Sequence, residues 1–282
     1  MNQNDWDIEI LPKANFFKVD FKEIWRFRDL MTLFIKRDIV SVYKQTVLGP
    51  LWFFIQPLLT TIVFTIVFGN IAKISTDGKP AILFYLSGIV LWTYFADAIN
   101  NTAATFTTNA AIFGKVYFPR IIMPLAKVFS NLLKFCIQML LLIAIYCYLL
   151  ATNKIAFDIK PTILLLPFLI LIMINLGMGI GMLVSSLTTK YKDLTFLLGF
   201  GVQLLMYASP VIYSIDTIKN TPYYKYIAYN PISPVIETFR NSILGGVIDY
   251  VMLLYAFVVS IIILVIGFFI FNHTEKTFID TV

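Results

Sequence analysis

The side chains in this sequence that could do chemistry are few. It contains one histidine, His273, two cysteines and only 13% charged residues. No Ser/His/Asp, Cys/His or paired-carboxylate arrangement can be assembled from it, so a catalytic nucleophile or acid–base pair has no candidate. The phosphate-binding pattern G-x-x-x-x-G-K-[ST] does not occur, which excludes ATP binding in the P-loop manner. We therefore predict that the chain is not an enzyme and binds no metal or cofactor of its own.

A short segment over residues 109–123 combines positive charge with aromatic rings. Lys115 and Arg120 lie among aromatic residues, and the segment is bounded by Gly114 and by Pro119 and Pro124. Exposed aromatic rings are costly unless something covers them. Two interpretations follow, namely burial against the protein's own helices or docking to a separate partner. A second, briefer charged segment is Lys190-Tyr191-Lys192-Asp193.

The long connection over residues 214–246 is rich in proline and tyrosine. Its second half, 232–244, has helical spacing but is too short to cross a bilayer, which predicts a re-entrant or interfacial helix. Glu237 and Arg240 are three residues apart there, as in a local ion pair. The tyrosines are typical of an aromatic belt at a membrane interface, or of faces that stack on sugar rings.

The segments that connect these charged and aromatic residues are long apolar runs, which we interpret as membrane spans. Composition is 59% hydrophobic with a mean hydropathy of +0.82, far from a soluble protein. Each apolar run reaches the ~20 residues that cross a bilayer as a helix. We predict an all-α integral membrane protein with a single transmembrane domain, 1–282, and six spans. These are 51–71, 81–101, 121–151, 161–187, 193–213 and 247–271.

Two charged residues, Asp97 and Lys134, fall inside the predicted spans. Placing a charge within the bilayer costs about 2.5 to 3.5 kcal/mol on insertion scales. Such a charge indicates either packing and hydrogen bonding to a neighbouring helix or the lining of an aqueous path. Lys134 is near enough to its span end to snorkel. In the fourth run, Gly177, Gly181 and Ser185 repeat every four residues, which predicts close approach of another helix.

The positive charges predict the orientation. Fourteen Lys and Arg residues fall on the side of the two termini and seven on the other, which places both termini in the cytoplasm. The net charge of +6 fits this bias and contact with anionic lipid, and not nucleic-acid binding. Residues 1–50 are predicted to be a cytoplasmic tail with an amphipathic interface helix, broken by Gly49 and Pro50. That helix either anchors the chain or also transmits movement.

Several segments, in order and spacing, resemble the membrane subunits of polysaccharide-exporting ABC transporters of the type 2 family, above all O-antigen permeases. They are RDIVSVYKQTVLGPLWFFIQPL (37–58), KVYFPR (115–120), YKD (191–193), ASPVIY (208–213) and NPISPVIETFR (230–240). The resemblance implies a homodimer in the bacterial inner membrane, with two copies of an ATP-binding subunit that holds ATP and Mg. The implied cargo is a polyprenyl-diphosphate-linked glycan. Teichoic acid or capsular polysaccharide export is the alternative within the family. A proton-coupled flippase or a membrane glycosyltransferase is the alternative outside it.

The resemblance also assigns roles. The gate helix would include Arg37, Asp38, Tyr43, Lys44, Gln45, Gly49 and Trp52. The ATPase-coupling helix, within 109–123, would include Phe113, Gly114, Lys115, Val116, Tyr117, Phe118, Pro119 and Arg120, and Tyr191, Lys192 and Asp193 would form a second contact. The outer re-entrant segment 214–246 and the turn before it would form a gate with Pro210, Asn230, Pro231, Glu237 and Arg240. As a further hypothesis, Trp92, Tyr94, Phe95, Tyr207 and Tyr213 line the channel.

Overall fold

The computed structural model describes residues 21–44, 47–113, 118–157, 159–191 and 193–278, and every regular element in these ranges is helical. Some predicted positions lie outside the described residues, so their roles stay predictions. They are the tail 1–20, Gln45, the coupling residues Gly114, Lys115, Val116 and Tyr117, and Lys192.

Among the residues that the structure describes, five helices are long and apolar enough to cross a membrane, and they coincide with five of the six predicted spans. The first, Gly49–Ile71, contains α3 (Trp52–Phe64) between two shorter helical turns, η1 (Gly49–Leu51) and η2 (Thr65–Ile71). The others are α4 (Ala81–Ala103), α6 (Ile122–Ala151), Pro161–Thr188, which joins η3 (Pro161–Leu165) to α7 (Leu166–Thr188), and α12 (Tyr250–Phe278).

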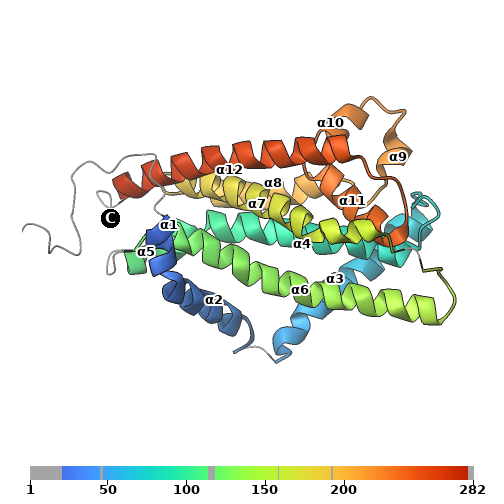
Figure 1. Cartoon of the computed structure of the whole chain (residues 1–282), viewed down its shortest axis with the longest axis horizontal. Coiled ribbons are helices and arrows are strands. Elements are labelled where there is room, and N and C mark those ends of the chain that lie inside the picture. The colour runs from blue at the N-terminus through green and yellow to red at the C-terminus, as the bar shows by residue number, and fades with distance from the viewer. Residues whose placement is uncertain (1–20, 45–46, 114–117, 158, 192, 279–282) are drawn as a thin grey trace, which may run out of the picture.

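The predicted span 193–213 is too long. Its helix, α8 (Leu194–Tyr207), has 14 residues and therefore extends about 21 Å. That is less than the ~30 Å of hydrocarbon in a bilayer. Residues 208–213 form turns instead, where Pro210 lacks the backbone N–H that a continuing helix needs. In Figure 1, α8 runs back from the end of α7 toward α9–α11, but the count of six spans remains a prediction.

Short helices gather at the two ends of the bundle (Figure 1). At one end, here called the α5 end, lie α1 (Phe21–Arg26), α2 (Arg28–Tyr43) and α5 (Thr105–Phe113). At the opposite end, the α11 end, lie α9 (Ile215–Ile218), α10 (Tyr224–Ala228) and α11 (Ser233–Leu244). α11 is the short helix predicted over 232–244. The predicted helix over 109–123 is not one element, because α5 ends at Phe113 and α6 begins at Ile122.

Helix α2 ends before the predicted breaker at Gly49 and Pro50. Gly49 has φ of 49°, a left-handed conformation that glycine adopts without steric cost. Pro50 stands in the first turn of η1, where its missing N–H would be unpaired anyway. The chain therefore turns from α2 into the first span at this glycine.

Helix α4 is the centre of the bundle and is buried along most of its length. It packs against α3, α6, α7 and α11. The predicted small-residue stripe on α7 faces it. A Cβ added at Gly177 would lie 2.6 Å from Cβ of Ala98, and one at Gly181 would lie 2.5 Å from Cβ of Thr102. The close approach predicted for this stripe is confirmed.

A second close crossing joins α7 to α12. An added Cβ at Gly267 would overlap the carbonyl oxygen of Gly179, which is backbone and cannot move aside cheaply. We expect Gly267→Ala to destabilise the protein by roughly 1 to 3 kcal/mol, the usual cost of overpacking. The measurement is the unfolding temperature in detergent. Gly69→Ala on η2 is the control, because an added Cβ there would lie 3.6 Å from the nearest atom, a ring carbon of Tyr85, which is ordinary van der Waals contact. Equal unfolding temperatures for the two variants would contradict this crossing.

Candidate functional site

A buried arginine fastens α11 to the rest of the bundle. Arg240 has no exposed surface and pairs with Glu237, with Nη1 3.1 Å from Oε1, so the predicted ion pair is present. Its Nη2 donates to the carbonyl oxygens of Pro210 at 2.9 Å and Val211 at 3.3 Å. The guanidinium carbon lies 3.7 Å from the ring centroid of Phe84 on α4. A buried cation is tolerated only when it is paired and hydrogen-bonded in this way.

Asn230 holds the turn after α8 from the other side. Its Nδ2 donates to the carbonyl oxygen of Ala208 at 3.0 Å and to Oγ of Ser209 at 3.1 Å. Four of the predicted gate residues thus converge on one turn, and Pro231 directly follows Asn230 in the chain. They are Pro210, Asn230, Glu237 and Arg240.

Two further residues complete this cluster, and the sequence does not single them out. One is Phe84, which lies under the guanidinium. The other is Gly88, where an added Cβ would lie 2.9 Å from Nη2 of Arg240. Both belong to a continuous apolar run, so hydropathy and spacing carry no signal that separates them from lipid-facing neighbours.

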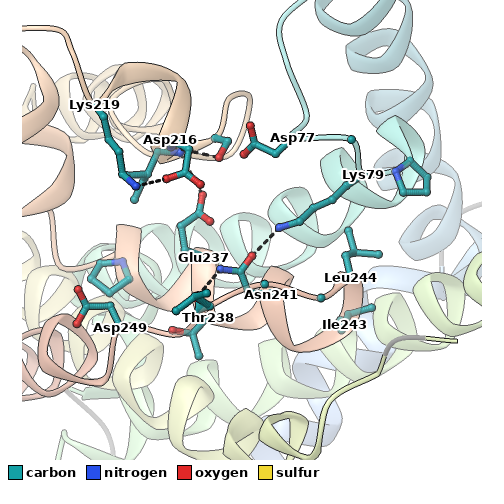
Figure 2. A pocket seen from close by; sticks show the side chains of 18 of the residues that line it. Asp77, Lys79, Asp216, Lys219, Glu237, Thr238, Asn241, Ile243, Leu244 and Asp249 are labelled. Atoms are coloured by element: carbon teal, nitrogen blue, oxygen red, sulfur yellow. Dashed lines mark hydrogen bonds and ion pairs between the residues drawn. The ribbon is translucent and has the colours of Figure 1, made fainter. Parts of the chain in front are cut away.

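A cavity of about 980 Å³ also lies at the α11 end, between the loops before α4, after α6 and before α12. Figure 2 shows Lys79, Glu237 and Asn241 meeting there from the loop before α4 and from α11. Nζ of Lys79 donates to Oδ1 of Asn241 at 2.6 Å. Burial lowers the pKa of Lys79, and the nearby Glu237 carboxylate partly opposes that change. No sequence motif points to this cavity, because its lining comes from segments far apart in the chain.

The two charges inside the spans pair with each other. Nζ of Lys134 on α6 lies 2.6 Å from Oδ2 of Asp97 on α4, and it also lies 5.9 Å from the ring centroid of Phe53 on α3. Pairing offsets part of the cost of holding either charge at this depth. The hydrogen-bonding role predicted for Asp97 is therefore present, and Lys134 bonds to it.

Helix α2 is tied to the bundle through one carboxylate. Asp38 pairs with Arg37 at 2.9 Å and with Lys127 of α6 at 2.8 Å. Nη2 of Arg37 also lies 3.5 Å from Oδ1 of Asn109 on α5. Movement of α2 would therefore act directly on α5 and α6. Of the other gate-helix residues, Lys44 is exposed, Gly49 is buried and Trp52 is about half exposed.

Part of the predicted coupling segment packs against the protein itself. Phe118 is only 4% exposed, and its ring centroid lies 5.8 Å from that of Phe34 on α2. Arg120 is also buried, at 5% exposed. Burial against the protein's own helices, one of the two interpretations, therefore applies to these residues. Tyr191 and Asp193 of the second predicted contact are exposed and accessible.

Three of the predicted channel aromatics do not line an open path. Trp92, Tyr94 and Phe95 are at most 6% exposed and belong to the core around α4. The ring of Trp92 lies 5.4 Å from that of Phe95, and the ring of Tyr94 lies 5.4 Å from that of Phe135. The hypothesis is wrong for these three, because α4 is central and its rings point to neighbouring helices.

The other two channel candidates lie near the surface of α8 and the turn after it. Tyr207 is half exposed, and the Tyr213 hydroxyl donates to the carbonyl oxygen of Tyr207 at 3.0 Å. For these two residues the channel assignment stays a prediction.

Several helices long enough to cross a membrane, a helix α2 held to them by ion pairs, and the buried cluster of Arg240, Glu237 and Phe84 at the opposite end, here called the α11 clamp, define a polytopic helical membrane protein. The chain belongs to the ABC-2 type transporter family, whose sequence model matches residues 29–244. The family predicted from the sequence motifs is thereby confirmed.

Similar proteins extend over most of the chain. The O-antigen export system permease protein RfbA of Klebsiella pneumoniae is 26% identical over 255 residues, which cover 89% of this chain and 94% of that protein. A protein of the same description from Myxococcus xanthus is 23% identical over 201 residues, covering 71% and 74%. The polysialic acid transport protein KpsM of Escherichia coli is 23% identical over 250 residues, covering 87% and 93%.

Proposed function

We propose that this chain is the membrane permease of an ATP-driven exporter that moves a lipid-linked polysaccharide across the bacterial inner membrane. The observation that carries the proposal is similarity over 89% of the chain to an O-antigen export permease. Similarity to a polysialic acid transporter supports polysaccharide export as the shared activity. The cargo favoured within this class is a polyprenyl-diphosphate-linked glycan of the O-antigen type. Teichoic acid or capsular polysaccharide is the alternative.

Energy would come from two copies of a separate ATP-binding subunit docked at the α5 end, which we place in the cytoplasm with both termini. The sequence has no P-loop, which supports ATP binding by a separate subunit and transport by this chain. Closure of the partner would push the segment 113–117. The contact between Phe118 and Phe34 and the ion pairs of Asp38 would then pass the movement to α2 and α6.

The permease itself would be a homodimer. One face of α8 supports this, because Phe196, Leu197 and Phe200 are at least 60% exposed. Gly199 and Gly201 on the same helix have nothing within 4 Å of an added Cβ. Small residues in a membrane helix allow close approach of another helix. A second copy packed there would place α8, with Tyr207, beside the path for the glycan.

Reconstitution tests this function. The permease and its ATP-binding partner are placed in liposomes with the host's lipid-linked polysaccharide, and glycan reaching the far side is measured. We expect transport only with ATP and both subunits. A partner unable to hydrolyse ATP is the control. Transport by the permease alone, driven by a proton gradient and lost in Asp97→Asn, would instead establish a proton-coupled flippase.

A further inference from the structure

The cavity at the α11 end has no part in the coupling scheme above, yet it has the properties of a binding site. Its volume of about 980 Å³ lies at the upper end of the ~300 to 1,000 Å³ range of small-molecule sites. Loops 77–80, 154–156 and 245–249 meet α9 and α11 around it. Segments widely separated in sequence thus build one concave surface.

The charges lining the cavity nearly balance. The lining contains four carboxylates and three ammonium groups. The carboxylates belong to Asp77, Asp216, Glu237 and Asp249, and the ammonium groups belong to Lys79, Lys154 and Lys219. A phosphate or another anion would meet the four carboxylates, and a metal cation would meet the three lysines. Either charge would be repelled by part of the lining, so the balance favours a ligand without net charge.

The polar groups are held in place before any ligand arrives. Asn241 accepts from Lys79 at 2.6 Å and donates to the carbonyl oxygen of Val247 at 2.8 Å. Glu237 accepts from the backbone N–H of Ile215 at 3.4 Å and from Arg240 at 3.1 Å. Groups fixed in this way lose little conformational freedom on binding, which favours affinity.

The lining suits a ligand that both donates and accepts. Carboxylates and amide oxygens accept, ammonium groups donate, and a sugar hydroxyl can do both. Apolar side chains lie between these groups, and they include Ile155, Ala156, Ile243, Leu244 and Met252. Such surfaces match the C–H faces of a sugar ring, whereas a lipid tail would exclude water from the charged groups and offer them no hydrogen bond in its place.

We propose that this cavity binds one or a few uncharged sugar units of the exported glycan as the polymer passes the α11 end. This rests on the proposed function, since it assigns a binding site to that same cargo. The cavity takes the glycan and not the lipid diphosphate, because its four carboxylates oppose phosphate. It would hold emerging polymer beside the α11 clamp.

Binding is tested with the full-length permease in lipid nanodiscs. The probe is host polysaccharide freed from its lipid by mild acid, and saturation-transfer NMR reports contact with sugar ring protons. We expect a signal with the unmodified permease. Ala156→Trp, which fills the cavity from an exposed position, should raise the half-saturating concentration by about ten-fold or more. Phe157→Trp is the matched control, because Phe157 is exposed and does not line the cavity.

Each outcome separates this inference from the proposed function. Absence of signal, or equal signal in Ala156→Trp, overturns the glycan site even where ATP-dependent export is intact. Competition by inorganic phosphate or calcium also overturns it, since the site would then recognise charge. A signal that Ala156→Trp abolishes, in a permease that shows no ATP-dependent export with its partner, supports the site and refutes the proposed function.

Discussion

Arg240→Ala is expected to destabilise the permease by roughly 3 to 5 kcal/mol, the cost of removing one partner from a buried ion pair. The change leaves the Glu237 carboxylate without its cation and the carbonyl oxygens of Pro210 and Val211 without a donor. It also empties the space against Phe84. We expect a large fall in the unfolding temperature in detergent. Export should fall with it, because α11 loses its attachment to α4 and to the turn after α8.

Two companion variants show whether charge or shape is responsible. Arg240→Lys keeps the charge, but a single ammonium group cannot bond to Glu237 and to both carbonyl oxygens as the planar guanidinium does. We therefore expect this variant also to be less stable than the unmodified permease. Arg240→Met combined with Glu237→Gln removes both charges together and should recover part of the loss, as replaced buried pairs often do. Lys225→Ala, at an exposed position on α10, is the control for loss of a positive charge. An unfolding temperature for Arg240→Ala equal to that of Lys225→Ala would show that the clamp does not stabilise the fold.

Replacing residues 115–117 with Gly-Ser-Gly is expected to abolish association with the ATP-binding subunit while the permease stays folded. The structure indicates which neighbours to spare, because Phe118 and Arg120 are buried within the permease itself. Association is measured by co-purification and by ATP hydrolysis of the complex. We expect at least about a hundred-fold weaker binding, as when a central aromatic contact and a charge are both lost from an interface.

Phe118→Ala is the companion variant, with the opposite expectation. Its ring packs on Phe34 of α2, so truncation should lower permease stability by about 3 to 5 kcal/mol, as for buried phenylalanines. The partner should still bind the variant at low temperature. If the 115–117 replacement binds the partner as tightly as the unmodified permease, the coupling role belongs elsewhere, and exposed Tyr191 and Asp193 become the next candidates.

The amino-acid sequence is enough to place this protein in a membrane and to indicate its class. Apolar runs of bilayer length predicted the spans, because backbone groups in hydrocarbon must bond within a helix. Five runs proved to be such helices, and the sixth gave a helix that ends at Tyr207. The close helix contact at Gly177 and Gly181 could be predicted, because small residues at helical spacing allow close approach whichever helix is the partner. The ion pair of Glu237 with Arg240 could be predicted as well, because its two residues are only three positions apart on one helix.

Which helix faces turn toward the protein interior becomes clear from the packing of the folded chain. In a membrane both the lipid and the protein interior are apolar, so hydropathy does not separate a buried ring from a lipid-facing one. For this reason the sequence suggests Trp92, Tyr94 and Phe95 as channel residues, whereas in the fold they pack around central α4. The same limit hid Phe84 and Gly88 beneath Arg240. The pairing of Asp97 with Lys134 and the cavity at the α11 end needed contacts between segments far apart in the chain, and folding alone brings those segments together.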